Sequence, residues 1–596
     1  MKKSILAALF VSSMLLAACS PSVPEEPSEP EESSEVTPSS SESSSEAAPS
    51  SSEATVYEVT LSQTTASVAK DETITLTATS NYGGASFVWA SNKENIATVD
   101  QNGVVKGIAP GTAKISATLT GRTEKAECEV TVVAGYYIAE PTEILVQTTF
   151  NDTYGQVFKD AIEDLQKKEP HLTIKYDKYS GGYYDLASAV IDGIPANNYP
   201  DVVLAYPDSV ADFINAGVPL KMDKYMNNAD YGWSEAEKND FYKTYLDEGQ
   251  DYQIAGTYSL PIAKSTEGLY YDEDKIIGLS LAAIDPTING GNAINEDYLK
   301  TLTWEEFFGK LAPALLAYRE TLPTDAAKKA FLDQTTNSDW AVLGYDSDDN
   351  LFITLAEQYG YGYTSRNATT GNGNIDFVND GMKNLIKTFN KAYENRYFTT
   401  KGIVGTNVNK RFNDDSMLFS IGSTGGVNYQ YSDQNPKNVG VVRIPQAAGR
   451  ETKLIQQGPS LAFLDHKKDE NRANRGLATW LFYKELTNVT RMISWGTITG
   501  YSPIRKSVAE SDDFLEFANV SNYEPKTLDR LKALNAGYAE STMQYLFSSP
   551  VFKGSAEARK QVGGLVTEAL VIKDITDAKL NELFETAKNN ALLKMK

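Results

Sequence analysis

The sequence predicts an α/β protein that is preceded by a small all-β sandwich. Three observations carry this prediction. Residues 142–596 begin with β-rich runs that alternate with helical segments, and residues 55–134 contain only short β-rich runs separated by turn residues. The chain has 596 residues, which is too many for one hydrophobic core. We therefore expect at least two domains.

The composition limits the classes of partner. Hydrophobic residues make up 41% of the chain and charged residues 22%, as in ordinary soluble proteins. The net charge is −24, from 79 acidic and 55 basic residues. This balance argues against nucleic acid or anionic lipid as the main partner. The only two histidines, His171 and His466, lie far apart in sequence, which disfavours zinc.

The N-terminus has the pattern of a secretory signal. Lys2 and Lys3 precede an apolar run over residues 5–16, and the sequence Leu-Ala-Ala-Cys then ends at Cys19. This ending resembles a bacterial lipobox, which implies cleavage before Cys19 and a lipid on its thiol, hence an anchor on the extracellular face of the membrane. The alternative is an ordinary signal with a chance cysteine. With Cys19 lipidated, Cys128 has no partner for a disulfide.

Residues 20–54 are rich in Ser, Glu and Pro, with nine Glu and no Lys or Arg. Such a segment has too little apolar surface to offset its ordering entropy. We expect a disordered tether that raises the following domains above the membrane.

The pattern of residues 55–134 predicts a small β-sandwich, because a β-rich run recurs about every ten residues. Its string VWASNKENIATVDQNGVVKGIAPGTAKISA resembles the bacterial Ig-like domain of group 2. That resemblance implies a spacer or, alternatively, a carbohydrate or surface adhesion module. Cys128 lies in an alternating run and is interpreted as a small core residue.

The segment 142–596 opens with repeated strand–turn–helix units. The expected elements are strands at 144–146, 172–176 and 201–205, and helices at 153–168, 184–191 and 209–216. Such units predict a parallel sheet with helices on both faces. Ligands of these sheets lie beyond the carboxyl ends of the strands. Residues 148–151, 179–184 and 206–209 are therefore expected at the rim of one site.

The pattern of residues 258–276 predicts two buried strands joined by a polar turn, Lys264-Ser265-Thr266-Glu267. Asp272 and its neighbours end the second run and are expected to cap a short helix. A polar turn between buried strands is a place where side chains can enter a cleft.

This stretch, YSLPIAKSTEGLYYDEDKI, resembles a segment of the extracellular solute-binding proteins of ABC importers. In those proteins the chain crosses there from the first lobe to the second. These proteins form the maltose-binding-protein-like group, family 1. Further strings resemble the family in the expected order: NYPDVVLAYPDSVADFINAGVPLKMDKYM, TWEEFFGKLA, MLFSIGSTGG, NVGVVRIPQ, ANRGLATWLFYKELTN and WGTITGYSPIRKS. The resemblance implies a two-lobed periplasmic-binding-protein type II fold. It also implies a monomer without a cofactor that closes on a small solute, most often a saccharide, and delivers it to a membrane permease.

Sugars present apolar faces to aromatic rings and hydroxyl groups to polar side chains. On this ground, and from positions after strands or in matching motifs, the candidate ligand-binding residues are Asn151, Asp152, Tyr183, Tyr184, Tyr206, Asp208, Glu267, Trp340, Ser423, Thr424, Trp495 and Tyr501. For each of them the alternative is packing or a solvated position. Peptides or other polar solutes are alternatives to a saccharide.

Three other interpretations of the sequence are a calcium site, an enzyme and an adhesin. Asp346, Asp348, Asn350 and Glu357 match the spacing of a calcium loop, but Leu351 stands where that loop needs Gly, so helix capping is favoured. No common hydrolase or nucleotide-binding motif occurs, and we expect no enzyme, although a glycosidase carboxylate pair would leave no sequence signal. The main rival is an adhesin that holds surface polysaccharide. Residues 279–300 and 362–373 match no family segment and could reshape the pocket.

Overall fold

The computed structural model describes residues 56–133 and 135–596. It divides into two compact units, one formed mainly by residues 56–131 and one mainly by residues 132–596. The expected signal, tether and lipidation site at Cys19 lie outside the described residues. No helix in the described ranges is long and apolar enough to cross a membrane.

The smaller unit is the predicted all-β region. Its strands are β1 (Val59–Leu61), β2 (Thr65–Ala69), β3 (Thr73–Thr75), β4 (Ala78–Ser80), β5 (Phe87–Ser91), β6 (Ala97–Val99), β7 (Val104–Gly107), β8 (Gly111–Leu119) and β9 (Lys125–Val133). They form a four-stranded sheet β2-β9-β8-β5, a three-stranded sheet β3-β7-β6 and the pair β1-β4. These sheets confirm the small all-β unit that the recurring β-rich runs predict.

The core of this unit explains its sequence motif. Trp89, Val105 and Ile115 are buried, and so is Cys128, which alternates with exposed neighbours in β9. Burial raises the pKa of the Cys128 thiol. Gly103 adopts φ +79°, and a Cβ there would lie 2.2 Å from a backbone carbonyl oxygen. This turn therefore requires glycine, and Cys128 is confirmed as a core residue.

The first lobe of the larger unit is built on a five-stranded sheet in the order β11-β10-β12-β22-β13. Its strands are β10 (Thr142–Thr148), β11 (Leu172–Lys178), β12 (Val202–Ala205), β13 (Ser259–Pro261) and β22 (Ser460–Phe463). The first three strands are parallel, but β22 runs antiparallel to both β12 and β13. The expected parallel sheet is therefore wrong at one strand: β22, which follows the return from the second lobe, runs antiparallel to its two neighbours.

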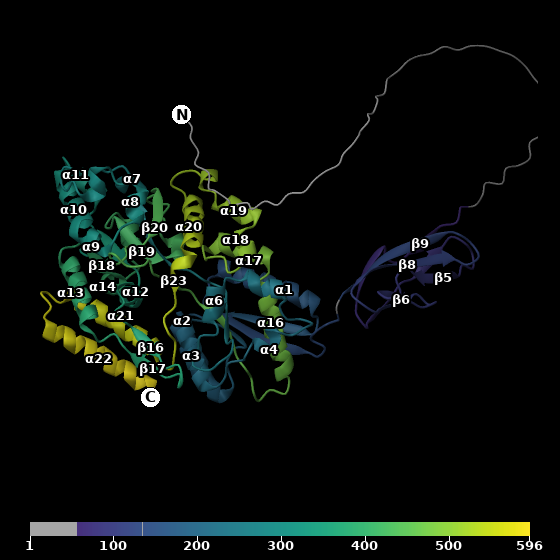
Figure 1. Cartoon of the computed structure of the whole chain (residues 1–596). Coiled ribbons are helices and arrows are strands. Elements are labelled where there is room, and N and C mark those ends of the chain that lie inside the picture. The colour runs from purple at the N-terminus through teal and green to yellow at the C-terminus, as the bar shows by residue number, and fades with distance from the viewer. Residues whose placement is uncertain (1–55, 134) are drawn as a thin grey trace, which may run out of the picture. The chain divides into compact units, whose positions relative to one another are not determined.

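Helices cover both faces of this sheet, as predicted. Val202 and Leu204 belong to one buried core, while Val203 and Ala205 belong to another on the opposite face. The first lobe contains α1 (Asp152–Lys168), α2 (Tyr183–Gly193), α3 (Pro207–Ala216), α4 (Asp223–Met226), α5 (Glu235–Asp240), α6 (Lys243–Glu248), α16 (Arg472–Leu486), α17 (Val489–Thr499), α18 (Lys506–Ala509) and α19 (Asp512–Ala518). Helix α16 packs beside α1 although the two lie far apart in sequence (Figure 1).

The second lobe repeats this sheet pattern in the order β18-β15-β19-β14-β20. Its strands are β14 (Glu267–Asp272), β15 (Leu343–Tyr345), β18 (Phe398–Thr400), β19 (Phe419–Ser423) and β20 (Val439–Arg443). The strands β18, β15 and β19 are parallel, and β14 is antiparallel to β19 and β20. A separate hairpin pairs β16 (Thr364–Arg366) with β17 (Gly373–Ile375).

The helices of the second lobe come from the middle and the end of the chain. They are α7 (Glu273–Ile276), α8 (Glu296–Lys300), α9 (Trp304–Glu306), α10 (Ala312–Thr321), α11 (Asp325–Phe331), α12 (Asp348–Tyr359), α13 (Asp380–Glu394), α14 (Lys401–Val404), α15 (Asn409–Asn413), α21 (Ser555–Val571) and α22 (Asp577–Met595). In Figure 1 the yellow α21 and α22 lie with the teal helices of this lobe. Helix α20 (Leu528–Thr542) packs against β20.

The chain passes between the lobes three times. It crosses from β13 to β14, returns between β21 (Leu454–Ile455) and β22, and passes again from β23 (Leu546–Phe547) to α21. The parallel pairing of β21 with β23 ties the last two crossings together. The sequence predicted the first crossing correctly, and Asp272 caps α7 by accepting a hydrogen bond from the Asp274 N–H.

Candidate functional site

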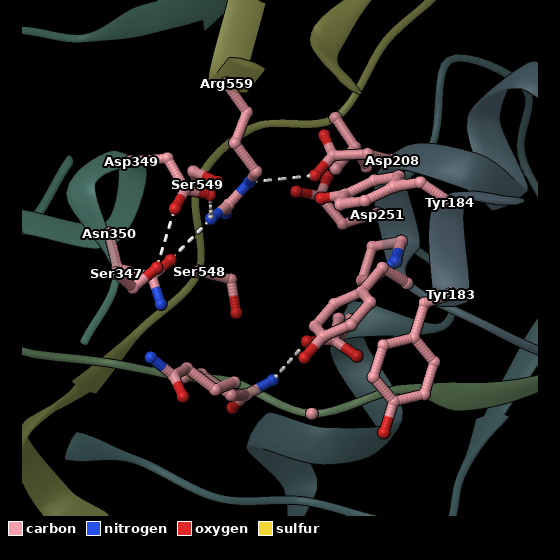
Figure 2. A pocket seen from close by; sticks show the side chains of 17 residues that line it. Tyr183, Tyr184, Asp208, Asp251, Ser347, Asp349, Asn350, Ser548, Ser549 and Arg559 are labelled. Carbon is pink, nitrogen blue, oxygen red and sulfur yellow. Dashed lines mark hydrogen bonds and ion pairs between the residues drawn. The ribbon is translucent and has the colours of Figure 1, made fainter. Parts of the chain in front are cut away.

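A cavity of about 230 Å³ lies between the two lobes. The first lobe contributes Tyr183, Tyr184, Tyr206, Pro207, Asp208, Glu248 and Asp251; the second contributes Ser347, Asp349, Asn350 and Arg559; the crossings contribute Gln456, Gln457, Gly458, Ser548, Ser549 and Val551. Figure 2 shows these side chains around the open space. The cavity is thus assembled from both lobes and their connections.

Strand direction explains why these residues meet. Helices α2, α3 and α12 begin just after the carboxyl ends of β11, β12 and β15, and the first turns of all three helices reach the cavity. This is where α/β sheets place their ligands. Pro207 stands at the first position of α3, where its missing N–H costs no hydrogen bond. The predicted rim segments 179–184 and 206–209 therefore contribute to one wall.

The first-lobe wall is aromatic. The rings of Tyr184 and Tyr206 are nearly parallel, with centroids 6.2 Å apart and planes 16° apart. The ring of Tyr183 meets Tyr206 edge-on at 5.2 Å. Tyr184 keeps 44% of its surface exposed. The wall therefore offers ring faces together with phenol hydroxyls.

Arg559 spans the cavity from the opposite side. Its Nε donates to Asp208 Oδ2 at 3.2 Å, and its Nη1 donates to Asp349 Oδ2 at 3.1 Å and to the side-chain oxygen of Asn350 (Figure 2). One guanidinium thus joins α3 of the first lobe to α12 of the second. Among the cavity-lining residues it is the one cation, against four carboxylates.

A second tie between the lobes lies at the rim. Arg366, on the hairpin strand β16, donates through Nη1 to the backbone carbonyls of Asp251 (2.7 Å) and Val551 (3.1 Å), and its Nη2 pairs with the Asp251 carboxylate. Asp251 and Val551 both line the cavity. The unmatched segment 362–373 therefore does reach the edge of the site.

The floor of the cavity contains a buried ion pair. Lys264 has no exposed surface, and its Nζ pairs with the Glu248 carboxylate and donates to the Gly458 carbonyl at 3.1 Å. Gln456 Nε2 donates to Glu248 Oε1 at 2.7 Å. The expected polar turn around Lys264 is thus a buried crossing, because its polar groups find partners inside the protein.

Glu267 lies one layer behind the cavity. It is 1% exposed and accepts hydrogen bonds from the Tyr345 hydroxyl, from Asn350 Nδ2 (3.2 Å) and from Gln457 Nε2 (2.7 Å). Burial raises its pKa to about 7, and the hydrogen bonds oppose that shift. Glu267 therefore does not line the cavity itself but holds two amides, Asn350 and Gln457, that do.

The structure brings together four of the predicted ligand residues: Tyr183, Tyr184, Tyr206 and Asp208 line the cavity. Tyr501 stacks on Trp495 with centroids 5.7 Å apart and planes 2° apart, and Trp495 is buried in the first-lobe core. Neither of these two residues lines the cavity.

The other predicted residues lie elsewhere. Asn151 caps α1, and Asp152 pairs with a lysine on the surface. Ser423 and Thr424 hydrogen-bond to the first crossing, with the Ser423 Oγ 3.0 Å from the Ser265 Oγ. Trp340 precedes β15, at the strand end opposite the cavity, and lies beneath the guanidinium of an arginine.

The calcium-loop residues do not converge. Asp346 accepts a backbone N–H at 3.0 Å, Asp348 begins α12 and accepts a backbone N–H at 2.9 Å, and Glu357 lies 3.6 Å from Lys453 Nζ. Asn350 faces the cavity instead. Within the described ranges, no group of three or more His, Cys, Asp or Glu residues could hold a metal ion.

Sequence reasoning missed Asp349, Asp251 and Arg559, and the cavity residues of the two return crossings. Asp349 and Asn350 lie in the acidic run 346–350, whose pattern indicates a metal loop or a helix start and not a solute site. Arg559 lies 209 residues after Asn350, one of its two partners in the second lobe. No local pattern marks such a residue.

Comparison with known proteins agrees with this architecture. Residues 160–522, more than half of the chain, match the family model described as bacterial extracellular solute-binding protein, and residues 55–130 match the bacterial Ig-like domain of group 2. Among curated proteins, none matches this chain.

Solved structures share the fold at low identity. The chain is similar to UgpB from Mycobacterium tuberculosis in complex with glycerophosphocholine, at 14% identity and a TM-score of 0.55, covering 76% of this chain and 98% of that one. The GacH receptor of Streptomyces glaucescens, studied with acarbose, has 13% identity and a TM-score of 0.54 over 76% and 99% of the two chains.

A third structure, the maltose/maltodextrin-binding domain MalE from Bdellovibrio bacteriovorus bound to maltotriose, has 15% identity and a TM-score of 0.52 over 76% and 100% of the two chains. These likenesses confirm the two-lobed binding-protein fold, and the matching family consists of receptors rather than enzymes. With its small Ig-like domain in front, the chain belongs to the bacterial extracellular solute-binding proteins.

Proposed function

We propose that this protein is the lipid-anchored receptor of an ABC importer and that it binds a mono- or oligosaccharide between its lobes. One observation carries the proposal: the cavity combines a tyrosine wall on the first lobe with carboxylates from both lobes, amides and one arginine. Ring faces suit the C–H faces of a sugar, and the polar groups suit its hydroxyls.

The polar groups favour a ligand rich in hydrogen-bond donors. Asn350 and Gln457 each donate an amide N–H to Glu267; the Asn350 oxygen accepts from Arg559, and the Gln457 oxygen is directed away from Glu267. Asp208, Asp251 and Asp349 add carboxylate acceptors. Such a set of acceptors suits hydroxyl groups and disfavours anionic solutes, because the lone Arg559 is already shared by two carboxylates.

The connections between the lobes fit a receptor that opens and closes. Three crossings join the lobes, and Arg559 can pair with Asp208 only while the lobes are together. A solute that contacts both walls favours the closed form. That form is the one we expect a membrane permease to receive.

The anchoring part of the proposal rests on the sequence. The signal at 1–19 with its lipobox cysteine Cys19, the tether at 20–54, the Ig-like domain at 55–134 and the binding domain at 142–596 give a receptor held away from the outer face of the cell membrane. Two of the structural neighbours are described with the saccharide-type ligands acarbose and maltotriose, which supports the solute class.

A thermal-shift screen of the mature chain against saccharides, peptides and polyamines tests the solute class. A ligand at ~100 times its Kd stabilises the binding domain by ~2.7 kcal/mol. We expect a clear shift with one saccharide class. A shift with peptides or polyamines alone would replace the saccharide, and no shift together with retention on insoluble polysaccharide would replace the importer with an adhesin.

A further inference from the structure

The second lobe carries another hollow, away from the cleft. This groove, of about 470 Å³, lies between the helical segment that begins at α9, the end of α12 and one face of α13. Its size is within the range of small-molecule sites. Trp304, Phe308, Tyr359, Tyr361 and Tyr397 give it an aromatic lining.

The helix beside the groove is locally widened. Between α9 and α10 the chain forms a π-helical turn, Phe307–Leu311. Pro313 follows, and it has no N–H to donate to the carbonyl of Gly309, four residues before it, so a regular α-turn is disfavoured there. Such π-turns are frequent at functional sites. Phe308 and Gly309 of this turn line the groove, and a Cβ on Gly309 would meet nothing within 4 Å.

The rings of two tyrosines stack on each other and form an aromatic platform at one end of the groove. The rings of Tyr359 and Tyr361 have centroids 5.7 Å apart and planes 21° apart. Tyr359 is fixed by a 2.8 Å hydrogen bond from its hydroxyl to Glu305. The ring of Tyr361 lies against Gly381, where a Cβ would come within 2.6 Å of it. Tyr361 nevertheless remains 39% exposed, so its ring is accessible to a ligand.

A row of polar side chains runs along α13 on the other side. Asn384, Thr388, Lys391 and Asn395 all line the groove and all are exposed. Their spacing over eleven residues corresponds to about 17 Å of helix. The side-chain amides of Asn384 and Asn395 have no hydrogen-bond partner among the described residues. The row therefore offers free amide donors and acceptors along an extended path.

The two charged side chains of the groove already have hydrogen-bond or ion-pair partners within the protein. Glu305 accepts hydrogen bonds from Tyr359 and from the Ala448 N–H at 3.2 Å, and Lys391 lies 2.7 Å from the Glu394 carboxylate. This leaves neutral amides and hydroxyls beside ring faces. A lipid or a nonpolar peptide would leave the amide row unused, and a nucleic acid is disfavoured by the acidic chain.

From this combination we propose that the groove is a second saccharide-binding site, outside the cleft, which takes a run of neutral sugar units of a polysaccharide. One ring stacks on the Tyr359–Tyr361 platform, and hydroxyls of the following units bond to the amides along α13. The groove lies on one lobe only, so it binds an extended polymer without lobe closure. The inference is independent of the solute bound in the cleft.

Affinity electrophoresis of the mature chain in native gels tests this site, with starch, mixed-linkage β-glucan, xylan, arabinogalactan and inulin as probes. We expect at least one of these polymers to retard the wild-type protein. Gly309→Leu should fill the groove, and Tyr361→Ala should remove the exposed half of the platform. Each should weaken the affinity tenfold or more.

Matched controls separate the groove from the rest of the molecule. A Cβ added to Gly537, on α20, would also meet nothing within 4 Å, and neither Gly537 nor Gly309 has a positive φ. Gly537→Leu is therefore the control for Gly309→Leu. Tyr136 on the other lobe is 40% exposed, so Tyr136→Ala is the control for Tyr361→Ala. Both controls and the cleft variant Arg559→Met should be retarded like the wild type.

The proposal is overturned if none of the polymers retards the wild-type protein, or if both groove variants are retarded as strongly as it is. Loss of retardation in Arg559→Met alone would place polymer binding in the cleft and also overturn it. A failure here leaves the thermal-shift result for small saccharides untouched, so the two proposals fail separately.

Discussion

The cleft cavity and the groove on the second lobe offer ring faces to a ligand but are built in different ways. The cavity is assembled from two lobes and two return crossings, and it contains four carboxylates and one arginine. The groove is built from residues 304–309 and 359–397 of one lobe, and its two charged residues are Glu305, which accepts a hydrogen bond from Tyr359, and Lys391, which pairs with Glu394. The cavity therefore depends on how the lobes are held, and the groove does not.

The comparison of cavity and groove shows where buried charges are needed. Asp208, Asp349 and Arg559 form contacts across the cavity that are complete only when the lobes meet. Lys264 and Glu248 fix the crossing beneath them. A solute receptor needs such contacts because they distinguish its closed form from its open form, whereas a site on one lobe can rely on ring faces and amides.

The largest effect is expected from the buried pair. Lys264→Met leaves the Glu248 carboxylate buried without its cation, and we expect the free energy of unfolding of the larger unit to fall by ~3–5 kcal/mol. Urea denaturation followed by tryptophan fluorescence measures it. The double variant Lys264→Met/Glu248→Leu should recover much of the loss, and a single variant as stable as the wild type would show that the pair is not important for the crossing.

Next, Arg559→Met should open the lobes and weaken binding of the cleft solute by ~10–100-fold, because hydrogen bonds to charged groups contribute ~1.5–3 kcal/mol. Isothermal titration calorimetry with the solute from the screen measures the affinity, and small-angle X-ray scattering follows closure. Arg559→Lys keeps the charge but not the planar fork, so an intermediate affinity is expected. Unchanged affinity in Arg559→Met would remove this residue from the binding mechanism.

Measuring the free energy of unfolding over a pH series tests the raised pKa of Glu267, a buried carboxylate that has no counterpart in the groove. Its folded-state pKa of about 7 exceeds the unfolded value of ~4.3, so the folded protein holds a proton that the unfolded chain releases. Its contribution to stability is full below about pH 4.3 and is lost as pH rises to about 7, at up to ~1.4 kcal/mol per pH unit.

Glu267→Gln removes this titration, so the difference in unfolding free energy between wild type and variant should change over that pH window and level off outside it. Other buried carboxylates are the same in both proteins and cancel. A difference that is constant from pH 4 to pH 8 would contradict the raised pKa.

The smallest effect concerns the ring faces themselves. Tyr184 is partly exposed on the cleft wall, so Tyr184→Ala should weaken binding of the cleft saccharide by about twofold to tenfold, on the ~0.5–1.5 kcal/mol scale of aromatic contacts. Titration calorimetry measures the change, and Tyr184→Phe should bind nearly as the wild type. If the phenylalanine variant loses as much affinity as the alanine variant, the hydroxyl matters and not the ring.

Most of the fold could be predicted from the sequence, because strands, helices and the first crossing leave local patterns. The run around Val202 predicts a buried strand, Asp272 predicts a cap, and Tyr183 and Tyr206 follow strand ends that face one rim. The antiparallel strand β22 could not be predicted, because its pairing with β12 joins distant segments. The paired residues Val202 and Phe463, for example, are more than 250 residues apart.

Periodicity, turn chemistry and family motifs were enough to predict the two-lobed fold with a small β domain before it, and they placed Tyr183, Tyr184 and Tyr206 among the candidates for the cleft. That Asp349 and Arg559 line the cavity, and that Trp495 and Glu267 are buried behind it, follows from the packing of distant segments. The physical reason is that a side chain's neighbours across a cleft depend on how distant segments pack, and the local sequence records only the strand or helix on which it stands.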